Sequence, residues 1–186
     1  MDKVADVNAQ GEAYGNELQT ALLMGNMEIV QFLFSKGADV NTLGGRFGNA
    51  LQAAALEGSV EIVRVLMDRV ADVNAQGAAY GNALQAAAKR RNMSIVKLLM
   101  EKGADANAQG GEYGNALQAA AFWGNLEVVK LLLDKGADDN AQGGRCGNAL
   151  QAAAFWGNME IVKLLLDKGA MSMHRVADIG MLSRLH

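Results

Sequence analysis

The chain has 186 residues, a net charge of −3 and a single cysteine, and 51% of its residues are hydrophobic. This composition excludes an intrinsically disordered chain, and a pI of about 5.4 gives no basic footprint for nucleic acid. The sequence contains no apolar run long enough to cross a bilayer and no secretory signal at its start. We therefore expect an intracellular, cytoplasmic or nuclear protein, with neither nucleic acid nor a membrane as its partner.

Most of the chain consists of five similar blocks of 33 residues. The fourth and fifth blocks are identical at 28 of their 33 positions. A period of this length is typical of a solenoid, in which one supersecondary unit repeats and buries its apolar face only against its neighbours. Residues 1–4 are interpreted as part of a preceding repeat. The five blocks are residues 5–37, 38–70, 71–103, 104–136 and 137–169.

The fourth block shows which elements the unit contains. It begins with a loop rich in Gly at residues 104–114, which suits an exposed hairpin-like turn. Asn115 is a good N-cap for a short first helix over residues 116–123, built largely from Ala and Leu. The dipeptide Gly-Asn at 124–125 breaks the chain, and a second helix follows over residues 126–135 until Gly136. Each block is thus predicted to be a loop and two helices.

A loop, a short helix, Gly-Asn, a second helix and then Lys-Gly-Ala-Asp resemble the ankyrin repeat. The resemblance covers residues 5–169 and implies an all-α solenoid that binds other proteins. Where the family usually has Thr-Pro-Leu-His, this chain has Asn-Glu-Leu-Gln at residues 16–19 and Asn-Ala-Leu-Gln in the later blocks. Asn caps the helix in place of Thr, and Gln keeps a polar group that can bond to the loop. This variant is similar to the ankyrin arrays of filamentous fungi, which are often attached to NACHT-type receptors.

Within the five blocks, two helix ends depart from the glycine pattern of the repeat. Val70 stands where Gly37 and Gly103 end the second helix of their blocks, and Arg91 stands where other blocks have the Gly of the break between helices. Both slots favour the left-handed backbone conformation, in which a β-branched residue is strained. We expect the replacement of Val70 by Gly to stabilise the fold.

The resemblance implies that partners contact the ends of the first helices and the loop tips. The pairs Phe122-Trp123 and Phe155-Trp156 end the first helices of adjacent blocks, and we expect one aromatic of each pair to pack into the neighbouring repeat. The tips of the fourth and fifth blocks differ radically although their scaffolds hardly differ, which is typical either of a recognition surface or of relaxed constraint on exposed positions. The predicted contact residues are Arg46, Phe47, Glu112, Tyr113, Phe122, Trp123, Arg145, Phe155 and Trp156.

The run Lys89-Arg90-Arg91 occupies the corresponding place in the third block. It either extends the contact surface toward an acidic partner segment or is an ordinary solvated run whose cations lie near the end of a helix dipole.

Each end of the array allows two interpretations. The first block carries apolar residues such as Ile29 and Phe32, so it is either the edge of a truncated array or a surface that docks on another molecule, including a second copy. Residues 170–186 leave the repeat pattern and form either a short amphipathic cap or an unrelated tail.

Catalytic chemistry has little support in the sequence. The only histidines, His174 and His186, lie outside the repeats, and no phosphate-binding Gly-Lys dipeptide occurs. We predict a protein that is not an enzyme, without cofactor or metal, and a monomer unless the first repeat self-associates. Three hypotheses follow: an adaptor that binds another protein through its concave face and loop tips, a ligand-sensing fragment of a larger fungal receptor, and a spacer without a ligand.

Overall fold

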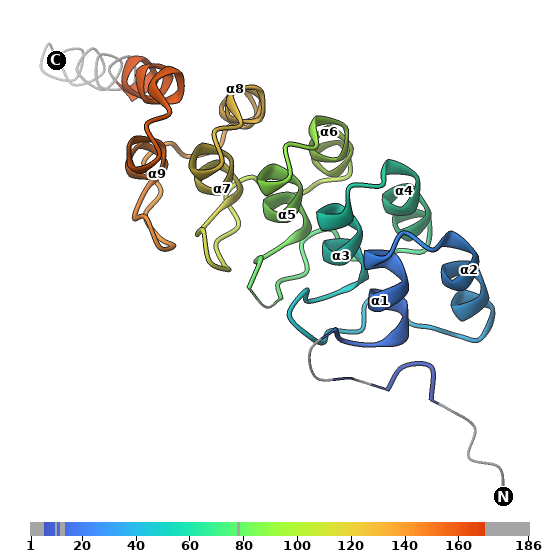
Figure 1. Cartoon of the computed structure of the whole chain (residues 1–186). Coiled ribbons are helices and arrows are strands. Elements are labelled where there is room, and N and C mark those ends of the chain that lie inside the picture. Colours follow the sequence, from blue (N-terminus) through green and yellow to red (C-terminus); the bar gives the residue numbers. More distant parts are fainter. Residues whose placement is uncertain (1–5, 10, 12–13, 78, 170–186) are drawn as a thin grey trace, which may run out of the picture.

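The computed structural model describes residues 6–169 except residues 10, 12, 13 and 78. Within this part of the chain the helices come in pairs, and a further helical segment over residues 159–169 completes the last pair (Figure 1). The part described contains isolated β-bridges in the loops but no longer strand. This architecture confirms the predicted all-α solenoid. The helices are α1 (Glu17–Leu23), α2 (Met27–Ser35), α3 (Ala50–Glu57), α4 (Val60–Asp68), α5 (Ala83–Lys89), α6 (Met93–Glu101), α7 (Ala116–Phe122), α8 (Leu126–Asp134) and α9 (Ala149–Phe155).

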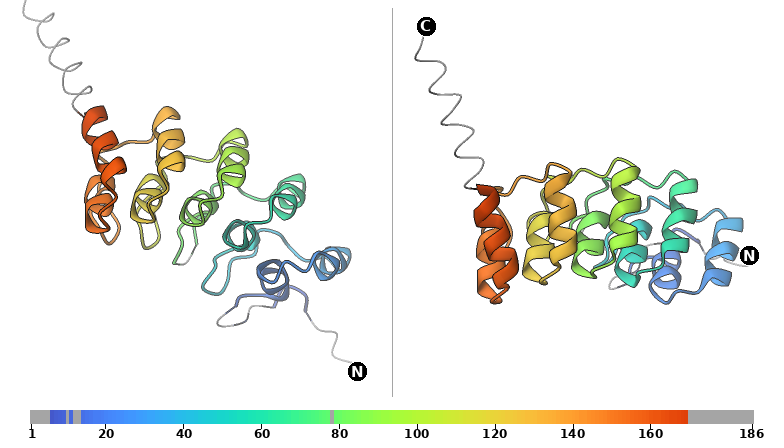
Figure 2. Two further views of the ribbon diagram at one scale, coloured as in Figure 1. Left: turned by 45° about the horizontal axis from the view of Figure 1, so that its top comes forward. Right: turned by 90° about the horizontal axis from the view of Figure 1, so that it is seen from above.

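The helices form two rows, seen in Figures 1 and 2. The first helix of each pair (α1, α3, α5, α7, α9) lies in an inner row, in which successive helices contact one another along the whole array. The second helices lie in an outer row and contact each other less. The array curves toward the inner row and the loops, and we call that side, formed by the C-terminal ends of the first helices and the loop tips, the concave face.

Each inner helix begins at an asparagine cap, as predicted. The Asn115 side chain accepts a hydrogen bond of 2.9 Å from the backbone N–H of Gln118, and the Gln118 side chain accepts one of 2.8 Å from the N–H of Asn115. This reciprocal capping box satisfies two N–H groups that a helix start otherwise leaves without a partner. It recurs at the starts of α1, α3 and α9.

The glutamine of the capping box also joins one repeat to the next. The Gln118 Nε2 group donates to the carbonyl oxygens of Ala141 and Gly147, both at 2.9 Å and both in the loop of the following repeat. Equivalent bonds run from the first three repeats to the loop of the next one. The prediction that this residue bonds to a loop is therefore confirmed, and the loop belongs to the neighbouring repeat. The residues that make these earlier bonds are Gln19, Gln52 and Gln85.

A second column of amide bonds runs along the loops. The Asn107 side chain donates to the Gly136 carbonyl at 3.1 Å and accepts from the Asp138 N–H at 2.8 Å, so it bridges two repeats. Asp105 in turn accepts a bond from the Asn107 N–H and holds the turn. The Asp-x-Asn motif of the blocks is thus a bridging device between consecutive repeats.

Small side chains allow the inner row to pack closely. Ala119, Ala120 and Ala121 are fully buried between α5 and α9, while Leu117 and Leu132 supply larger buried groups. Helices with alanine on their facing sides approach more closely than helices with large side chains. The burial of each leucine contributes about 1.5–3 kcal/mol to stability.

The backbone at Val70 and Arg91 has the conformation expected from the sequence. Both have φ of 60°, in the left-handed region, while Gly37 and Gly103 in the slot of Val70 have φ of 86° and 87°. The Val70 side chain is 81% exposed, so no packing compensates for its backbone strain.

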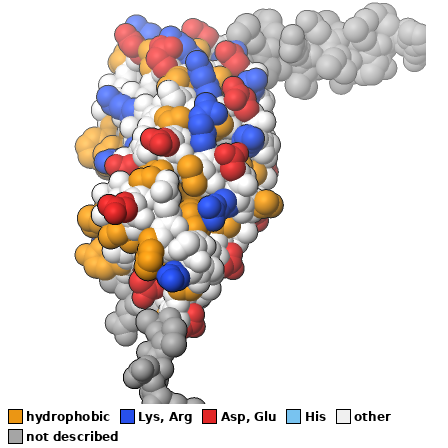
Figure 3. All heavy atoms as spheres, turned by 90° about the vertical axis from the view of Figure 1, so that its right-hand side faces the viewer, with side chains coloured by type: hydrophobic (Ala, Val, Ile, Leu, Met, Phe, Trp, Pro, Cys, Tyr) orange, Lys and Arg blue, Asp and Glu red, His pale blue; other side chains and the backbone are white. Residues whose placement is uncertain are grey.

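The interpretations of residues 1–4 and 170–186 lie outside the described residues. On the first repeat, Ile29 and Phe32 are exposed. Figure 3 shows the side of the molecule at which α2 lies in Figure 1, and there acidic and basic side chains are interspersed among apolar ones. Among the described helices, none is both long and apolar enough to span a membrane.

Candidate functional site

Aromatic rings from consecutive loop tips stack along the first half of the concave face. The ring of Phe47 lies 6.4 Å from that of Tyr14 and 6.1 Å from that of Tyr80, with interplanar angles of 23° and 9°. Phe47 is buried in this stack, whereas Tyr14 is exposed. The Arg46 guanidinium lies 5.4 Å from the centroid of the Phe47 ring and covers it from solvent.

The stack is interrupted between the third and fourth repeats, where Lys89 lies. The Lys89 ammonium is 4.5 Å from the ring centroid of Tyr80, 5.3 Å from that of Trp123 and 5.7 Å from that of Tyr113. The Tyr113 ring packs instead against Phe122, at 5.1 Å. A lysine at the end of α5 thus joins rings from two repeats.

The Tyr113 phenol stays protonated at neutral pH. Burial raises its pKa, and the nearby Glu112 carboxylate adds to this effect, while Trp123 and Arg145 oppose it. The side chain therefore serves as a neutral, buried ring that supports the surface beside it.

The two aromatic pairs differ in how much surface they present. Phe122 is 6% exposed and its ring lies edge-on to that of Trp156 at 5.3 Å, while Trp123 is 40% exposed. One member of the first pair thus packs into the neighbouring repeat, as expected. In the second pair, Trp156 makes this same contact with Phe122 of the fourth repeat, as expected, although Trp156 is 57% and Phe155 72% exposed. No described repeat follows α9 to cover the remaining surface of these two rings.

The tips of the last three loops are tied together by backbone bonds. The Glu112 N–H donates to the Ala79 carbonyl and the Arg145 N–H to the Glu112 carbonyl, both at 2.9 Å. The Arg145 and Glu112 side chains form an ion pair. Gly144 allows this close approach, because it has φ of 62° and a Cβ there would lie 2.2 Å from the backbone of Tyr113. The varied tip residues are therefore carried on a firmly held backbone.

The nine residues predicted to contact a partner fall into two groups. Three are buried and support the face from beneath, so they offer a partner little surface: Phe47, Tyr113 and Phe122. The other six are exposed or half-buried at the loop tips and helix ends: Arg46, Glu112, Trp123, Arg145, Phe155 and Trp156.

The structure separates the three cations of the third repeat. The Arg90 Nε donates to the Leu56 carbonyl at 2.8 Å, and the Arg91 Nη2 to the Trp123 carbonyl at 2.7 Å. Both arginines therefore bind carbonyl groups at the ends of neighbouring inner helices, the arrangement expected of helix-end cations. Only Lys89 is directed into the aromatic rings. Sequence reasoning had treated the three as one run and missed the role of Tyr80.

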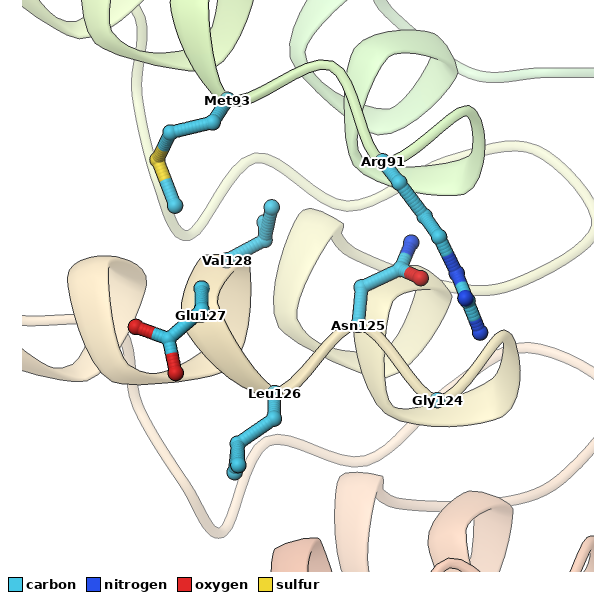
Figure 4. Close-up of a pocket in the computed structure, with 7 residues that line it drawn as sticks. All are labelled: Arg91, Met93, Gly124, Asn125, Leu126, Glu127 and Val128. Carbon is cyan, nitrogen blue, oxygen red and sulfur yellow. The ribbon is translucent and has the colours of Figure 1, made fainter.

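Two shallow hollows lie on the concave face. One, of about 330 Å³, is lined by residues from the first three repeats, and the other, of about 500 Å³, lies on the fifth repeat. A third hollow of about 360 Å³ lies at the turn between α7 and α8, where Arg91 extends past Asn125 toward Gly124 (Figure 4). The first hollow is lined by Leu23, Leu56, Glu57, Tyr80, Lys89 and Arg90, and the second by Arg145, Cys146, Gly147, Gln151 and Phe155.

Comparison with known families identifies the repeat. A family model described as ankyrin repeats (3 copies) matches residues 3–77 and 76–143, and one described as ankyrin repeat matches residues 148–176. These matches cover most of the chain, so the chain belongs to the ankyrin repeat family. No curated protein matches it.

Ankyrin repeats are in general protein–protein interaction modules, and proteins built from them are typically not enzymes. Within the part of the chain that the structure describes, no three His, Cys, Asp or Glu side chains lie close enough together to hold a metal ion. The concave face, with its rings and cations, is therefore the candidate functional site.

Proposed function

We propose that the chain binds a partner protein through its concave face and loop tips, without catalysing a reaction. The observation that carries the proposal is the group of exposed rings at the ends of α7 and α9, namely Trp123, Phe155 and Trp156. The Arg145 side chain lines the same hollow as Phe155. Large aromatic side chains and arginine are the residue types that contribute most to binding at protein interfaces.

The scaffold beneath this surface favours tight binding. The loop tips are held by backbone bonds between repeats, and the Trp123 and Trp156 rings both contact the buried Phe122. A surface that is already ordered loses little conformational entropy when a partner binds.

The test is affinity capture from a cell lysate with a set of matched variants. One variant carries Ser at Trp123, Phe155 and Trp156, which are exposed, so the fold should survive; circular dichroism checks this. The control carries Ser at Phe32 and Leu166, which are exposed apolar residues of the second helix of their repeats. We expect a protein that is retained by the native chain and the control but not by the first variant. Retention by all three chains would contradict the proposal.

The other two hypotheses remain predictions. The fungal receptor association is supported by none of the matches, and the spacer hypothesis predicts that the native chain and both variants capture the same proteins. The capture experiment therefore also discriminates the spacer from the binding module.

A further inference from the structure

We propose that the concave face selects a partner segment in which an acidic side chain is flanked by apolar ones, and that the acidic side chain binds the Lys89 ammonium. This inference rests on the proposed function and specifies the chemistry of the partner. Three observations support it: the position of Lys89 in the inner row, the aromatic rings around its ammonium group, and the absence of a hydrogen-bond or ion-pair partner for that group among the described residues.

Lys89 is the one charged residue in a column of five equivalent positions along the inner row. The first two positions hold leucine, the third holds Lys89 and the last two hold phenylalanine. A segment that lies along this column meets apolar groups on both sides of one central cation. The other members of the column are Leu23, Leu56, Phe122 and Phe155.

The Lys89 ammonium is positioned without being neutralised. The rings of Tyr80, Tyr113 and Trp123 hold it at 4.5–5.7 Å from their centroids. Ring faces attract a cation but accept no full hydrogen bond from it and cancel none of its charge. Among the described residues, no hydrogen bond or ion pair joins this half-buried ammonium to an oxygen atom. Its three N–H donors are therefore available to a carboxylate.

The nearby acidic residues, Glu112 and Glu57, form no ion pair with the Lys89 ammonium in the described part of the chain. Glu112 is paired with Arg145, and Glu57 lines the same hollow as Lys89 but forms no ion pair within the described residues. Arg90 adds a second positive charge beside the hollow. The centre of the concave face is thus locally basic in a chain whose net charge is −3. Complementary charge of this kind acts mainly on partner selection and on the rate of association.

The hollow beside Lys89 explains why apolar neighbours are expected. It has a volume of about 330 Å³, and Leu23, Leu56 and Tyr80 contribute apolar surface to its lining. On the other side of Lys89 lies the exposed Trp123 ring. An apolar side chain placed beside the acidic one would fill the hollow and exclude water, which strengthens the charge pair.

The test selects a phage library of random 12-residue peptides against the full chain. The same library is selected against Lys89→Met, which keeps the length of the side chain, and against Lys97→Met, which makes the same charge change at an exposed position on α6. We expect the native chain and Lys97→Met to enrich peptides with Asp or Glu beside bulky apolar residues, and Lys89→Met to lose this preference.

One enriched peptide is then measured directly. Charge-assisted bonds of this type predict that it binds the native chain roughly tenfold or more tightly than Lys89→Met, that Lys89→Arg restores most of the affinity, and that replacing the peptide's acidic residue by its amide removes the difference. Enrichment of peptides without an acid, no enrichment, or equal binding to Lys89→Met would overturn the proposal. Lys89-dependent binding of a single-stranded oligonucleotide of similar length would overturn it in favour of a general anion site.

These outcomes are separate from those of the capture experiment. A partner lost only in the variant of the three exposed rings would leave the proposed function intact even where the peptide selection fails.

Discussion

The fourth and fifth repeats are identical at 28 of 33 positions but occupy different environments. Phe122 is 6% exposed, whereas Phe155, its equivalent, is 72% exposed. Gln118 is buried and bonds to the loop of the next repeat, whereas Gln151 is exposed and, among the described residues, bonds only within its own capping box. The same residue types therefore support the fold in one repeat and lie open to a partner in the next.

This difference follows from the way a solenoid is built. Each repeat covers one face of its predecessor, so a side chain on that face is buried by the repeat that follows it rather than by its own. Whether a side chain stabilises the fold or is available to a partner thus depends on its position in the array as much as on its residue type. Pairs of equivalent substitutions in the two repeats measure this effect directly.

The largest difference is expected for the phenylalanines. Phe122→Ala removes a buried ring that contacts Tyr113, Trp123 and Trp156, and we expect it to lower the free energy of unfolding by about 3 kcal/mol. Phe155→Ala removes an exposed ring and should lower it by less than about 1 kcal/mol. Urea denaturation followed by circular dichroism measures both. Equal losses would show that the end of the array is covered as the interior is.

The glutamines should show a smaller difference of the same sign. Gln118→Ala leaves the carbonyl groups of Ala141 and Gly147 without their side-chain donor, in a partly buried place. We expect a loss of about 2 kcal/mol. Gln151→Ala removes only the bonds of an exposed capping box and should cost about 0.5 kcal/mol. The same urea experiment applies, and a loss at Gln151 as large as that at Gln118 would contradict the bridging role.

At Val70 the comparison is the reverse of the previous two. The environment is the same, but the slot holds Val70 in one repeat and Gly103 in the next. Val70→Gly relieves a β-branched residue at φ of 60° whose side chain is 81% exposed, and we expect a gain of about 1 kcal/mol. The matched control is Gly103→Val, in the same slot of the next repeat with φ of 87°, which should lose a similar amount. An unchanged or lowered unfolding midpoint for Val70→Gly would show that the left-handed backbone carries no strain.

The period and the local signals of the sequence predicted the fold well. The 33-residue period indicates the repeating unit, and the Asn cap and the Gly-Asn break are encoded within a few residues of where they act. Even the strained backbone at Val70 was readable, because the other blocks show Gly in that slot.

The candidate site was predicted less completely, because its side chains are arranged by contacts between repeats. The loop tips carry an aromatic in four blocks, but only the structure shows that Phe47 lies buried in a stack while Tyr113 turns toward Phe122. In the same way, Lys89 and Arg90 are neighbours in the chain, yet one enters the rings and the other binds a helix-end carbonyl. Periodicity indicates which residues share a slot but not which way each side chain points.

The smallest expected effect concerns the ion pair between Glu112 and Arg145, which joins the tips of the two compared repeats. The two side chains are about a third and a half exposed, and solvent-screened pairs of this kind couple by about 0.5 kcal/mol. A double-mutant cycle with Glu112→Gln and Arg145→Gln measures the coupling, which should vanish at high salt.

The pair of Glu127 and Lys130, which lies within α8, is the matched control, since it joins no repeats. A coupling of several kcal/mol between Glu112 and Arg145 would mean that the tip side chains hold the fourth and fifth repeats together. A weak coupling means that the backbone bonds of the tips, the Gln118 bridge and the packing of α7 against α9 do so instead. In that case the residues at these two positions can be exchanged at little cost to stability, and the tips are free to differ from repeat to repeat as the partner requires.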